Sequence, residues 1–498
     1  MTKGKLNSNR PIQPGSAYSR GLFSSHPLQS PIGFHEILRV NVPKKILFVS
    51  SRSDIAGGEK YLLDVTRHMD RGRYRPMVVL PGQGSLQPAL EQLDVENIIV
   101  ESDYGWLRQP LYWYRYLRDL DGRVKFIAEL IRNENISLVH TNSNLRLEGV
   151  LAANLIGVPH VYMAHAAFQP GLSLYERFPL SSISFAQIMG DLSAKVIAVS
   201  HWLAATLAPP LNVDKVKVIH NGLDFNSFDD AIASTKGSIR NELGLPADTF
   251  VVTSVGRIDP EKGHDHLVKA AAQVCHRMQN AHFLLAGSDD DKAFSDQLRR
   301  DVKKLGLAER FHFLGFRSDV PRLLAESDVF VLTSRSEGLG FVVLEAMAAG
   351  RAVIATRCGG AEEPIIEGVT GKLVDVGDVA AIAEAILDLA GDRRRRTEMG
   401  AAARGHVRKN FCVRSSVNSL MEVYDEIFTT VPKRSHSLMA ELYLRGLFEV
   451  GDLGLRVVAL EERLRQVEHL AEAVRGNVLY KMARRVRHWS NSRASRSG

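Results

Sequence analysis

Residues 328–356 read DVFVLTSRSEGLGFVVLEAMAAGRAVIAT and contain the pattern that decides the fold. The apolar run DVFVLTS is followed by a loop with two glycines, an apolar segment of helical length and a second apolar run, AVIAT. Short runs that are apolar on both faces are typical of buried parallel strands, and parallel strands need a crossover between them. We therefore interpret this stretch as strand, turn, helix and strand, with Gly350 ending the helix.

The same alternation extends in both directions from this stretch. Helical patterns such as Glu59–Met69 separate most of the apolar runs, and this order predicts an α/β fold in which the strands are parallel. Because the alternation stops near residue 225 and restarts near residue 250, we expect two Rossmann-like, doubly wound domains that face a cleft. The predicted strands are residues 45–50, 75–80, 97–100, 137–141, 160–164, 195–200 and 216–220, then 250–255, 282–287, 310–315, 328–334 and 352–356.

Composition shifts along the chain predict five parts. Residues 1–43 are rich in Ser, Pro, Asn and Gly and predict a flexible arm. The two domains are expected at 44–225 and 246–430, the second with a closing helix, and a polar linker at 226–245. Residues 431–498 are expected to form a helical, basic extension.

The net charge of +7 is a property of the ends of the chain. Residues 475–498 hold seven basic and no acidic side chains, whereas residues 44–474 hold 51 basic and 55 acidic ones. A near-neutral body argues against nucleic acid as a partner. The three scattered cysteines, the absence of an apolar leader and the absence of an apolar run of spanning length predict a cytoplasmic protein.

Two glutamates flank the glycine turn of the opening stretch. Glu337 lies in the loop, and Glu345 lies about one turn inside the helix that starts near Phe341. Glycines let a ligand approach the backbone, and a helix N-terminus attracts phosphate oxygens. A carboxylate can accept hydrogen bonds from two neighbouring hydroxyls of a sugar or a ribose. The alternative is a capping glutamate followed by a solvated one.

Two cations follow the first strand of the second half, in VGRIDPEKGHDH at 255–266. Arg257 and Lys262 stand beside a strand end, where they could neutralise a diphosphate leaving group without water. The alternative is a basic surface turn.

These motifs resemble the signature of retaining GT-B glycosyltransferases, whose two glutamates are separated by seven residues. The similarity covers most of residues 44–428 and includes GGAEEPIIEGVTGKLVDVGD at 359–378. The resemblance implies that Glu337 contacts the hydroxyls of the donor sugar and Glu345 the ribose of the nucleotide. It also implies that Arg257 and Lys262 stabilise the departing diphosphate in place of a metal. The remaining donor-binding residues implied for this loop are Gly338, Leu339, Gly340 and Phe341.

The first half has weaker marks of the same family. Gly57 and Gly58 resemble its glycine loop near the donor phosphates, although a tight turn would explain them equally. His165 resembles a family histidine close to the reacting sugar and is a further candidate catalytic residue. Its alternative role is structural. Ser200 also matches, and its alternative is a helix N-cap.

Some residues depart from the family pattern. In AGSDDD at 286–291, Asp289 stands where the family usually has a second glycine. The acidic triplet 289–291 is interpreted as a loop and helix start, and His264-Asp265-His266 lacks further ligands at metal spacing. We therefore expect no metal and no cofactor.

The expected function is transfer of a sugar from a nucleoside diphosphate sugar to a glycan or lipid-linked acceptor, with retention of anomeric configuration. A UDP-sugar is favoured over a GDP-sugar. The alternatives are a GT-B nucleotide-sugar epimerase and a non-catalytic nucleotide-sugar-binding protein. A dehydrogenase is disfavoured because no GxGxxG fingerprint follows the first strand. The aromatic stretch 104–120 predicts either an acceptor-binding or membrane-facing helix or ordinary core packing.

The C-terminal extension has its own pattern. Apolar residues recur at alternating steps of four and three between Leu453 and Val478, which is the seam of a coiled coil. Such a stripe predicts a homodimer through 453–478 or a helix folded back on its own domain. Gly454 and Gly476 are expected to weaken either packing arrangement locally. The basic residues beyond it predict peripheral contact with the inner face of a membrane, with a solvated tail as the alternative.

Overall fold

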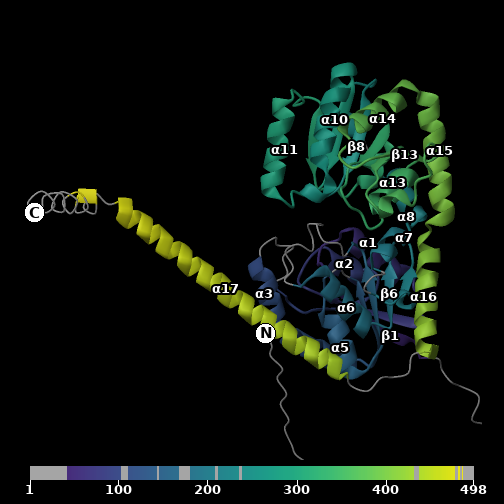
Figure 1. Ribbon diagram of the computed structural model, residues 1–498. Coiled ribbons are helices and arrows are strands. Elements are labelled where there is room, and N and C mark those ends of the chain that lie inside the picture. The colour runs from purple at the N-terminus through teal and green to yellow at the C-terminus, as the bar shows by residue number, and fades with distance from the viewer. Residues whose placement is uncertain are drawn as a thin grey trace, which may run out of the picture. The chain divides into compact units, whose positions relative to one another are not determined.

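The computed structural model describes residues 42–102, 110–142, 145–167, 180–207, 211–234, 238–430 and 437–476, and also 481, 482 and 485 (Figure 1). The predicted arm, apart from its last two residues, lies outside this range. From Pro43 onward the chain forms one compact unit that contains two sheets.

The first sheet has seven parallel strands in the order β3-β2-β1-β4-β5-β6-β7. The chain starts in the middle, winds to one edge and returns to wind to the other, which is the doubly wound arrangement. Its strands are β1 (Lys44–Ser50), β2 (Tyr74–Leu80), β3 (Glu96–Ile99), β4 (Ile136–Asn142), β5 (His160–Ala164), β6 (Lys195–Ala198) and β7 (Val216–Val218). Its helices are α1 (Gly57–His68), α2 (Leu86–Glu91), α3 (Pro110–Arg118), α4 (Leu120–Asn133), α5 (Glu148–Ile156), α6 (Ser182–Leu192), α7 (His201–Leu207) and η1 (Val213–Lys215).

The second sheet has six parallel strands in the order β10-β9-β8-β11-β12-β13. They are β8 (Phe250–Val255), β9 (Ala281–Ala286), β10 (Phe311–Gly315), β11 (Val329–Leu332), β12 (Ala352–Thr356) and β13 (Gly371–Val374). The helices of this part are η2 (Pro260–Lys262), α10 (His264–Arg277), α11 (Lys292–Lys304), α12 (Val320–Ala325), α13 (Phe341–Ala348), η3 (Gly360–Glu362), α14 (Val379–Gly391) and α15 (Arg393–Asn410). The predicted α/β, GT-B-like architecture is therefore confirmed.

Burial explains why the apolar runs became strands. The side chains of Leu47 in β1 and Val331 in β11 are fully buried, and so are their neighbours along each strand. A parallel sheet is covered on both faces by its crossover helices, so its strands need no polar face.

The predicted linker at 226–245 contains two helices, α8 (Phe225–Ser234) and α9 (Ile239–Glu242). Asp224, just before this range, and Ser238, within it, cap these helices. Asp224 accepts a hydrogen bond from the backbone N–H of Ser227, and Ser238 accepts one from the N–H of Arg240. A polar side chain thus caps the N-terminus of each of these two short helices.

The chain returns to the first sheet after α15. Helix α16 (Val413–Thr430) packs beside α1, whereas α15 packs beside the second sheet (Figure 1). The hydroxyls of Tyr61 and Ser416 are 2.8 Å apart, and Tyr74 donates to Asp425 at 2.6 Å. In space, α16 therefore belongs with the first sheet, although it follows the second in sequence.

The described part of the aromatic stretch, in α3, takes the core-packing role. Trp113 and Tyr116 are buried, and the hydroxyl of Tyr116 donates to Glu148 at 2.7 Å. Residues 104–109 lie outside the described range.

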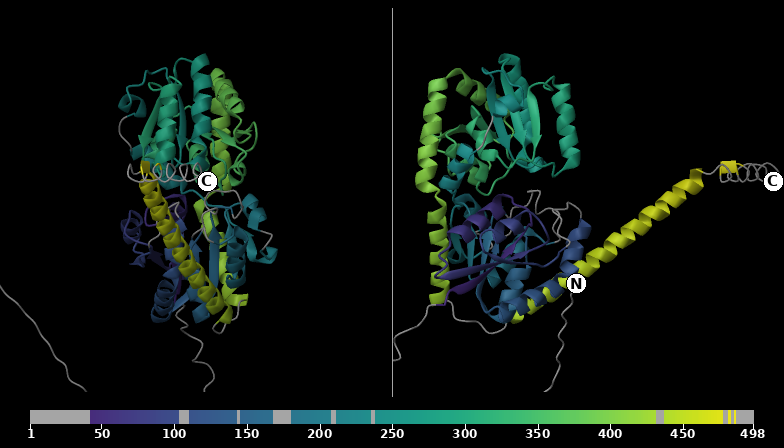
Figure 2. Two further views of the ribbon diagram at one scale, coloured as in Figure 1. Left: turned by 60° about the vertical axis from the view of Figure 1, so that its left-hand side comes forward. Right: turned by 180° about the vertical axis from the view of Figure 1, so that it is seen from behind.

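Helix α17 (Leu438–Gly476) folds back in its first half and packs on α3 (Figure 2). A Cβ on Gly451 would come within 2.5 Å of the Arg118 nitrogen, and one on Gly454 would overlap the ring of Tyr114. Gly454 was expected to weaken the packing of this segment locally, in a dimer or on its own domain, but it permits this close contact. Further along, the stripe is exposed at Leu453, Val457, Leu460, Leu464 and Val467.

The rest of the stripe and most of the basic end fall outside the side chains that the structure describes. Lys481, Met482 and Arg485 are described, and they are exposed. In the described ranges, no helix has both the length and the hydropathy needed to cross a membrane.

Two histidines are buried inside the first sheet. The Nδ1 atom of His140 is 2.6 Å from the Tyr424 hydroxyl, and burial lowers the pKa of His140 to about 3. His160 lies between Thr141 and Ser193, and burial lowers its pKa as well. Both imidazoles are therefore neutral in the folded protein at neutral pH.

Acid should weaken the fold through these groups. Between the unfolded pKa of about 6.5 and the folded value, the unfolded state binds more protons, so stability falls as pH falls. For His140 the slope is about 1.4 kcal/mol per pH unit. We expect His140→Gln to remove roughly that slope between pH 6 and 4, measured by urea unfolding, while His276→Gln, at an exposed position of α10, keeps it. Equal slopes in the two variants would contradict this assignment.

Candidate active site

Both sheets reverse their strand order beside their first strand, between β1 and β4 and between β8 and β11. Ligands of open parallel sheets bind beyond the carboxyl ends of strands at such a reversal. Arg257 follows β8 by two residues and Glu337 follows β11 by five. The topology therefore places the two predicted residues at the reversal of the second sheet.

Lys262 and Glu337 form an ion pair. The Lys262 Nζ is 2.6 Å from Glu337 Oε1, and the same oxygen accepts a hydrogen bond from Ser334 at 2.7 Å. Burial lowers the pKa of Lys262, but the carboxylates of Glu337 and Glu261 together raise it by more, so the net shift is upward. Lys262 is therefore a charged ammonium held against the carboxylate predicted to contact the donor sugar.

Arg257 stands among carboxylates. Its guanidinium is 3.0 Å from Asp259, 3.7 Å from Asp290 and 3.8 Å from Glu261. Burial lowers the pKa of Arg257, and these carboxylates raise it by more. Asp259 also caps η2 by accepting the N–H of Lys262 at 3.1 Å. Arg257, two residues after β8, and Lys262, the last residue of η2, thus both lie in the segment that follows β8.

The glycine loop meets the first domain. A Cβ on Gly338 would overlap the carbonyl oxygen of His165, so only glycine fits there. Gly340 has φ 72°, a left-handed conformation that favours glycine, and it starts α13. Leu339 between them is buried. The loop is therefore shaped to lie directly against the end of β5.

His165 lies where the end of β5 meets the glycine loop of the second domain. Its Nε2 is 2.8 Å from the Asn142 Oδ1, and burial lowers its pKa to about 4. A Cβ on Gly58 would be 3.6 Å from the imidazole, whereas Gly57 faces open space. His165, Gly58 and Gly338 are thus brought together, with a neutral imidazole at neutral pH.

The sequence reasoning missed Lys60 in α1. Its ammonium forms an ion pair with Glu345 in α13 and lies 5.0 Å from the ring centroid of Phe341. The Glu345 side chain is only 9% exposed, so this partner offsets the cost of burying its charge. The sequence feature that could have indicated this pair is a basic residue two positions after Gly58.

Arg52 was also missed. Its guanidinium is 3.9 Å from Asp290, which brings the loop after β1 to the carboxylate beside Arg257. Within the acidic triplet, Asp291 caps α11 by accepting the N–H of Phe294, and Asp289 accepts from Ser295 at 2.8 Å. The predicted loop and helix start is confirmed, and Asp290 has a role in the site that was not expected.

His264 and His266 each have a polar group of the protein within hydrogen-bonding distance. The His264 Nε2 is 3.1 Å from the carbonyl oxygen of Arg257, and the His266 Nε2 is 3.2 Å from the Arg335 guanidinium. Ser200, the other ambiguous residue, accepts the N–H of Leu203 at 3.0 Å and is a helix N-cap.

Comparison with known proteins agrees with this geometry. The family "Glycosyl transferases group 1" matches residues 235–406, which hold Arg257, Lys262, Glu337 and Glu345. "Glycosyltransferase Family 4" matches residues 55–227. The chain belongs to the group 1 glycosyltransferases.

Several known proteins are similar to more than half of this chain. Alpha-maltose-1-phosphate synthase of Mycolicibacterium smegmatis is 32% identical over 313 residues, which cover 59% of this chain and 80% of that protein. A galactosyltransferase of Escherichia coli, UDP-Gal:alpha-D-GlcNAc-diphosphoundecaprenol alpha-1,3-galactosyltransferase, is 27% identical, covering 62% of this chain and 80% of that protein. The crystal structure of Anabaena Alr3699/HepE with UDP and glucose is 26% identical, with a TM-score of 0.66, and covers 77% of this chain and all of that one. An epimerase is therefore not favoured.

The ion pair between Lys60 and Glu345 predicts coupling between the two positions. We expect Lys60→Met and Glu345→Gln each to lower stability, and the double variant to lose less than the sum. The coupling energy should be about 0.5–3 kcal/mol, because the residues share one contact. Thermal unfolding of the four proteins measures it, and Lys269→Met on the exposed face of α10 is the control. Additive losses would show that the pair contributes nothing.

Proposed function

We propose that this glycosyltransferase moves a sugar from a nucleoside diphosphate sugar to a glycan or lipid-linked acceptor with retention of anomeric configuration. The observation that carries the proposal is the position of Lys262, Arg257 and Glu337 at the strand-order reversal of the second sheet, against His165 of the first domain. A UDP-sugar is the favoured donor, since HepE binds UDP and the Escherichia coli relative is named for UDP-Gal. A GDP-sugar is the alternative.

The charges suit a diphosphate leaving group. Cleavage of a glycosyl–phosphate bond leaves negative charge on the diphosphate, which fixed cations in a water-poor site stabilise. Lys262 and Arg257 pair with carboxylates of the protein. A donor diphosphate can take these cations from the carboxylates, which frees Glu337 to accept hydroxyls of the sugar. Under this proposal no metal is needed for departure.

The two glutamates divide the donor between them. Glu337 lies in the loop beside His165, where the transferred sugar would sit. Glu345 lies farther along α13 and its carboxylate faces Lys60 of the first domain, which suits a ribose hydroxyl. The remaining loop residues, Gly338 to Phe341, would line the donor with backbone N–H groups at the start of α13.

We further propose that the enzyme works on the cytoplasmic side of a membrane and contacts it peripherally. The support is the basic C-terminal composition and the lipid-linked substrate in the name of the Escherichia coli relative. The exposed stripe of α17 keeps the homodimer through 453–478 as part of this proposal.

Removing either cation should cripple the chemical step. We expect Arg257→Ala and Lys262→Ala each to lower kcat by about 100-fold or more, because the leaving-group charge is greatest in the transition state. Lys269→Ala, on an exposed face of α10, should leave kcat unchanged. Donor turnover with UDP- and GDP-sugars measures the effect, and NMR of the product gives its anomeric configuration. An inverted product would overturn the retaining mechanism.

His165 should act on rate more than on nucleotide affinity. Its pKa of about 4 leaves it neutral at neutral pH, so it can hydrogen-bond the reacting sugar but carries no charge for the diphosphate. We expect His165→Ala to lower kcat while the Kd for UDP, measured calorimetrically, stays within about threefold. A variant that unfolds while its folded fraction keeps normal activity would make the histidine structural.

A further inference from the structure

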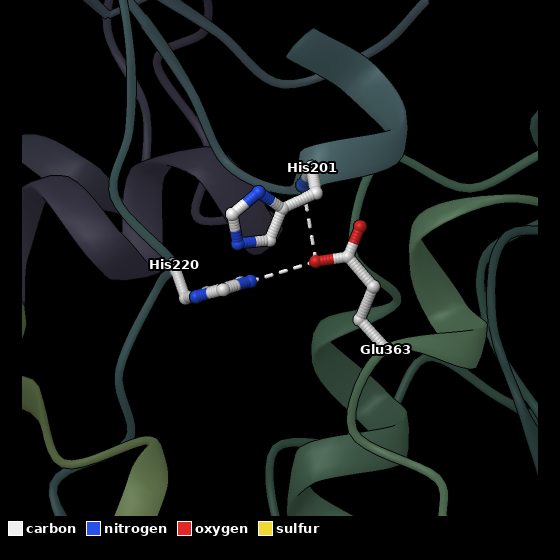
Figure 3. Close-up of side chains that lie close together, drawn as sticks. All are labelled: His201, His220 and Glu363. Atoms are coloured by element: carbon white, nitrogen blue, oxygen red, sulfur yellow. Dashed lines mark hydrogen bonds and ion pairs between the residues drawn. The ribbon is translucent and has the colours of Figure 1, made fainter. Parts of the chain in front are cut away.

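A second group of chemistry-bearing side chains lies apart from the donor residues, where His201, His220 and Glu363 meet (Figure 3). His201 begins α7, His220 follows β7, and Glu363 follows η3. Two residues therefore come from the first domain and one from the second. Each offers one ligand atom, and these atoms all lie within 4.8 Å of one another.

The carboxylate of Glu363 is held in place by the first domain. Its Oε1 accepts the backbone N–H of Trp202 at 2.7 Å, and its Oε2 accepts the N–H of His201 at 3.0 Å. The Nε2 of His220 is 2.7 Å from the same Oε2. Two backbone donors thus fix the carboxylate and leave it lone pairs for a further partner.

The imidazoles are oriented by their neighbours. The ring of His220 packs edge-on against Phe411, with centroids 5.3 Å apart, and its carbonyl oxygen accepts the Ser416 hydroxyl at 2.7 Å. The His201 ring lies 5.4 Å from the His220 ring and is exposed. One imidazole is therefore held, and the other can turn toward it from solvent.

We infer that His201, His220 and Glu363 form a site for a divalent transition-metal ion that links the two domains. Two imidazoles and one carboxylate are ligands that suit Zn²⁺, Co²⁺ or Ni²⁺ better than Mg²⁺ or Ca²⁺. Zinc ligands lie about 2.0–2.2 Å from the metal, so neighbouring donor atoms are roughly 3.3 Å apart. Rotation of the exposed His201 side chain would bring its ring nitrogen from within 4.8 Å of the other two ligand atoms to the distance that the metal needs. A water molecule would be the fourth ligand.

The ion would take the place of the hydrogen between His220 Nε2 and Glu363 Oε2, because metal binding uses the imidazole lone pair. This site was not expected from the sequence, where no metal was predicted. It is independent of the proposed reaction, since its ligands are not the residues assigned to the donor.

The site would nevertheless affect the donor loop through the backbone. Gly360, at the start of η3, donates its N–H to the carbonyl of Glu337 at 2.9 Å, and the N–H of Glu337 donates to Cys358 at 2.9 Å. A Cβ on Gly359 would be 2.6 Å from the Trp202 ring. An ion on Glu363 would thus hold the segment that supports Glu337 against the first domain and stabilise that arrangement by mass action.

Cobalt titration of the full-length, tag-free protein, first stripped with EDTA and dialysed, tests the inference. We expect one equivalent of Co²⁺ to bind with the visible absorption of a four-coordinate ion and to be displaced by Zn²⁺. His201→Gln should weaken binding by about 100-fold or more, because it removes a ligand. His201 is exposed, so this variant should keep the fold.

Two matched variants serve as controls. His276→Gln removes an exposed histidine of α10, and His312→Gln removes one member of the stacked pair His282–His312, whose ring nitrogens are 3.0 Å apart. Both should bind Co²⁺ as the unaltered chain does. Zn²⁺ should also raise the Tm of the unaltered chain and not that of His201→Gln. Absence of stoichiometric binding, or binding that survives His201→Gln, would overturn the site, whatever the outcome for glycosyl transfer.

Discussion

The parallel direction of every strand is the constraint on which the rest of this structure depends. Because neighbouring strands run the same way, their carboxyl ends meet at one edge of each sheet, and a reversal of strand order leaves that edge open between two crossovers. Lys262 and Glu337, which are 75 positions apart, form an ion pair at this edge. His165 reaches the same region from the corresponding edge of the first sheet.

The electrostatics of the site follow from this placement. Lys262 and Arg257 are both brought into surroundings where isolated charges would be costly, and each finds carboxylates there. Lys262 is paired with Glu337, and Arg257 is paired with Asp259. Lys60 of the first domain forms an ion pair with Glu345 of the second.

The contact between the two domains also requires that the backbone of the second domain come close to the first, which glycine allows. Gly338 lies on the carbonyl of His165, and Gly359 lies on the ring of Trp202, so the second domain touches the first through its backbone. Helix α16 completes the connection by returning to the first sheet, with Tyr61 and Ser416 in contact. A larger residue at either glycine would separate the surfaces on which the site depends.

The alternation of apolar runs and helical patterns was enough to predict the α/β class and the position of twelve strands, because burial on both faces leaves a local signal. The glycine loop could also be recognised from the sequence, since the glycines, Glu337 and Glu345 are close together in it.

Three contacts could not be predicted from local sequence. The pairing of Lys60 with Glu345, the approach of Asp290 to Arg257 and the meeting of Glu363 with His201 and His220 join residues up to 285 positions apart. The polar residues near 226–245 predicted a linker but not its two short helices, α8 and α9. The sequence thus carried the layers and the approximate positions of twelve strands. The tertiary structure decided which charges face one another, because strand order and domain contact, which no local pattern encodes, set those distances.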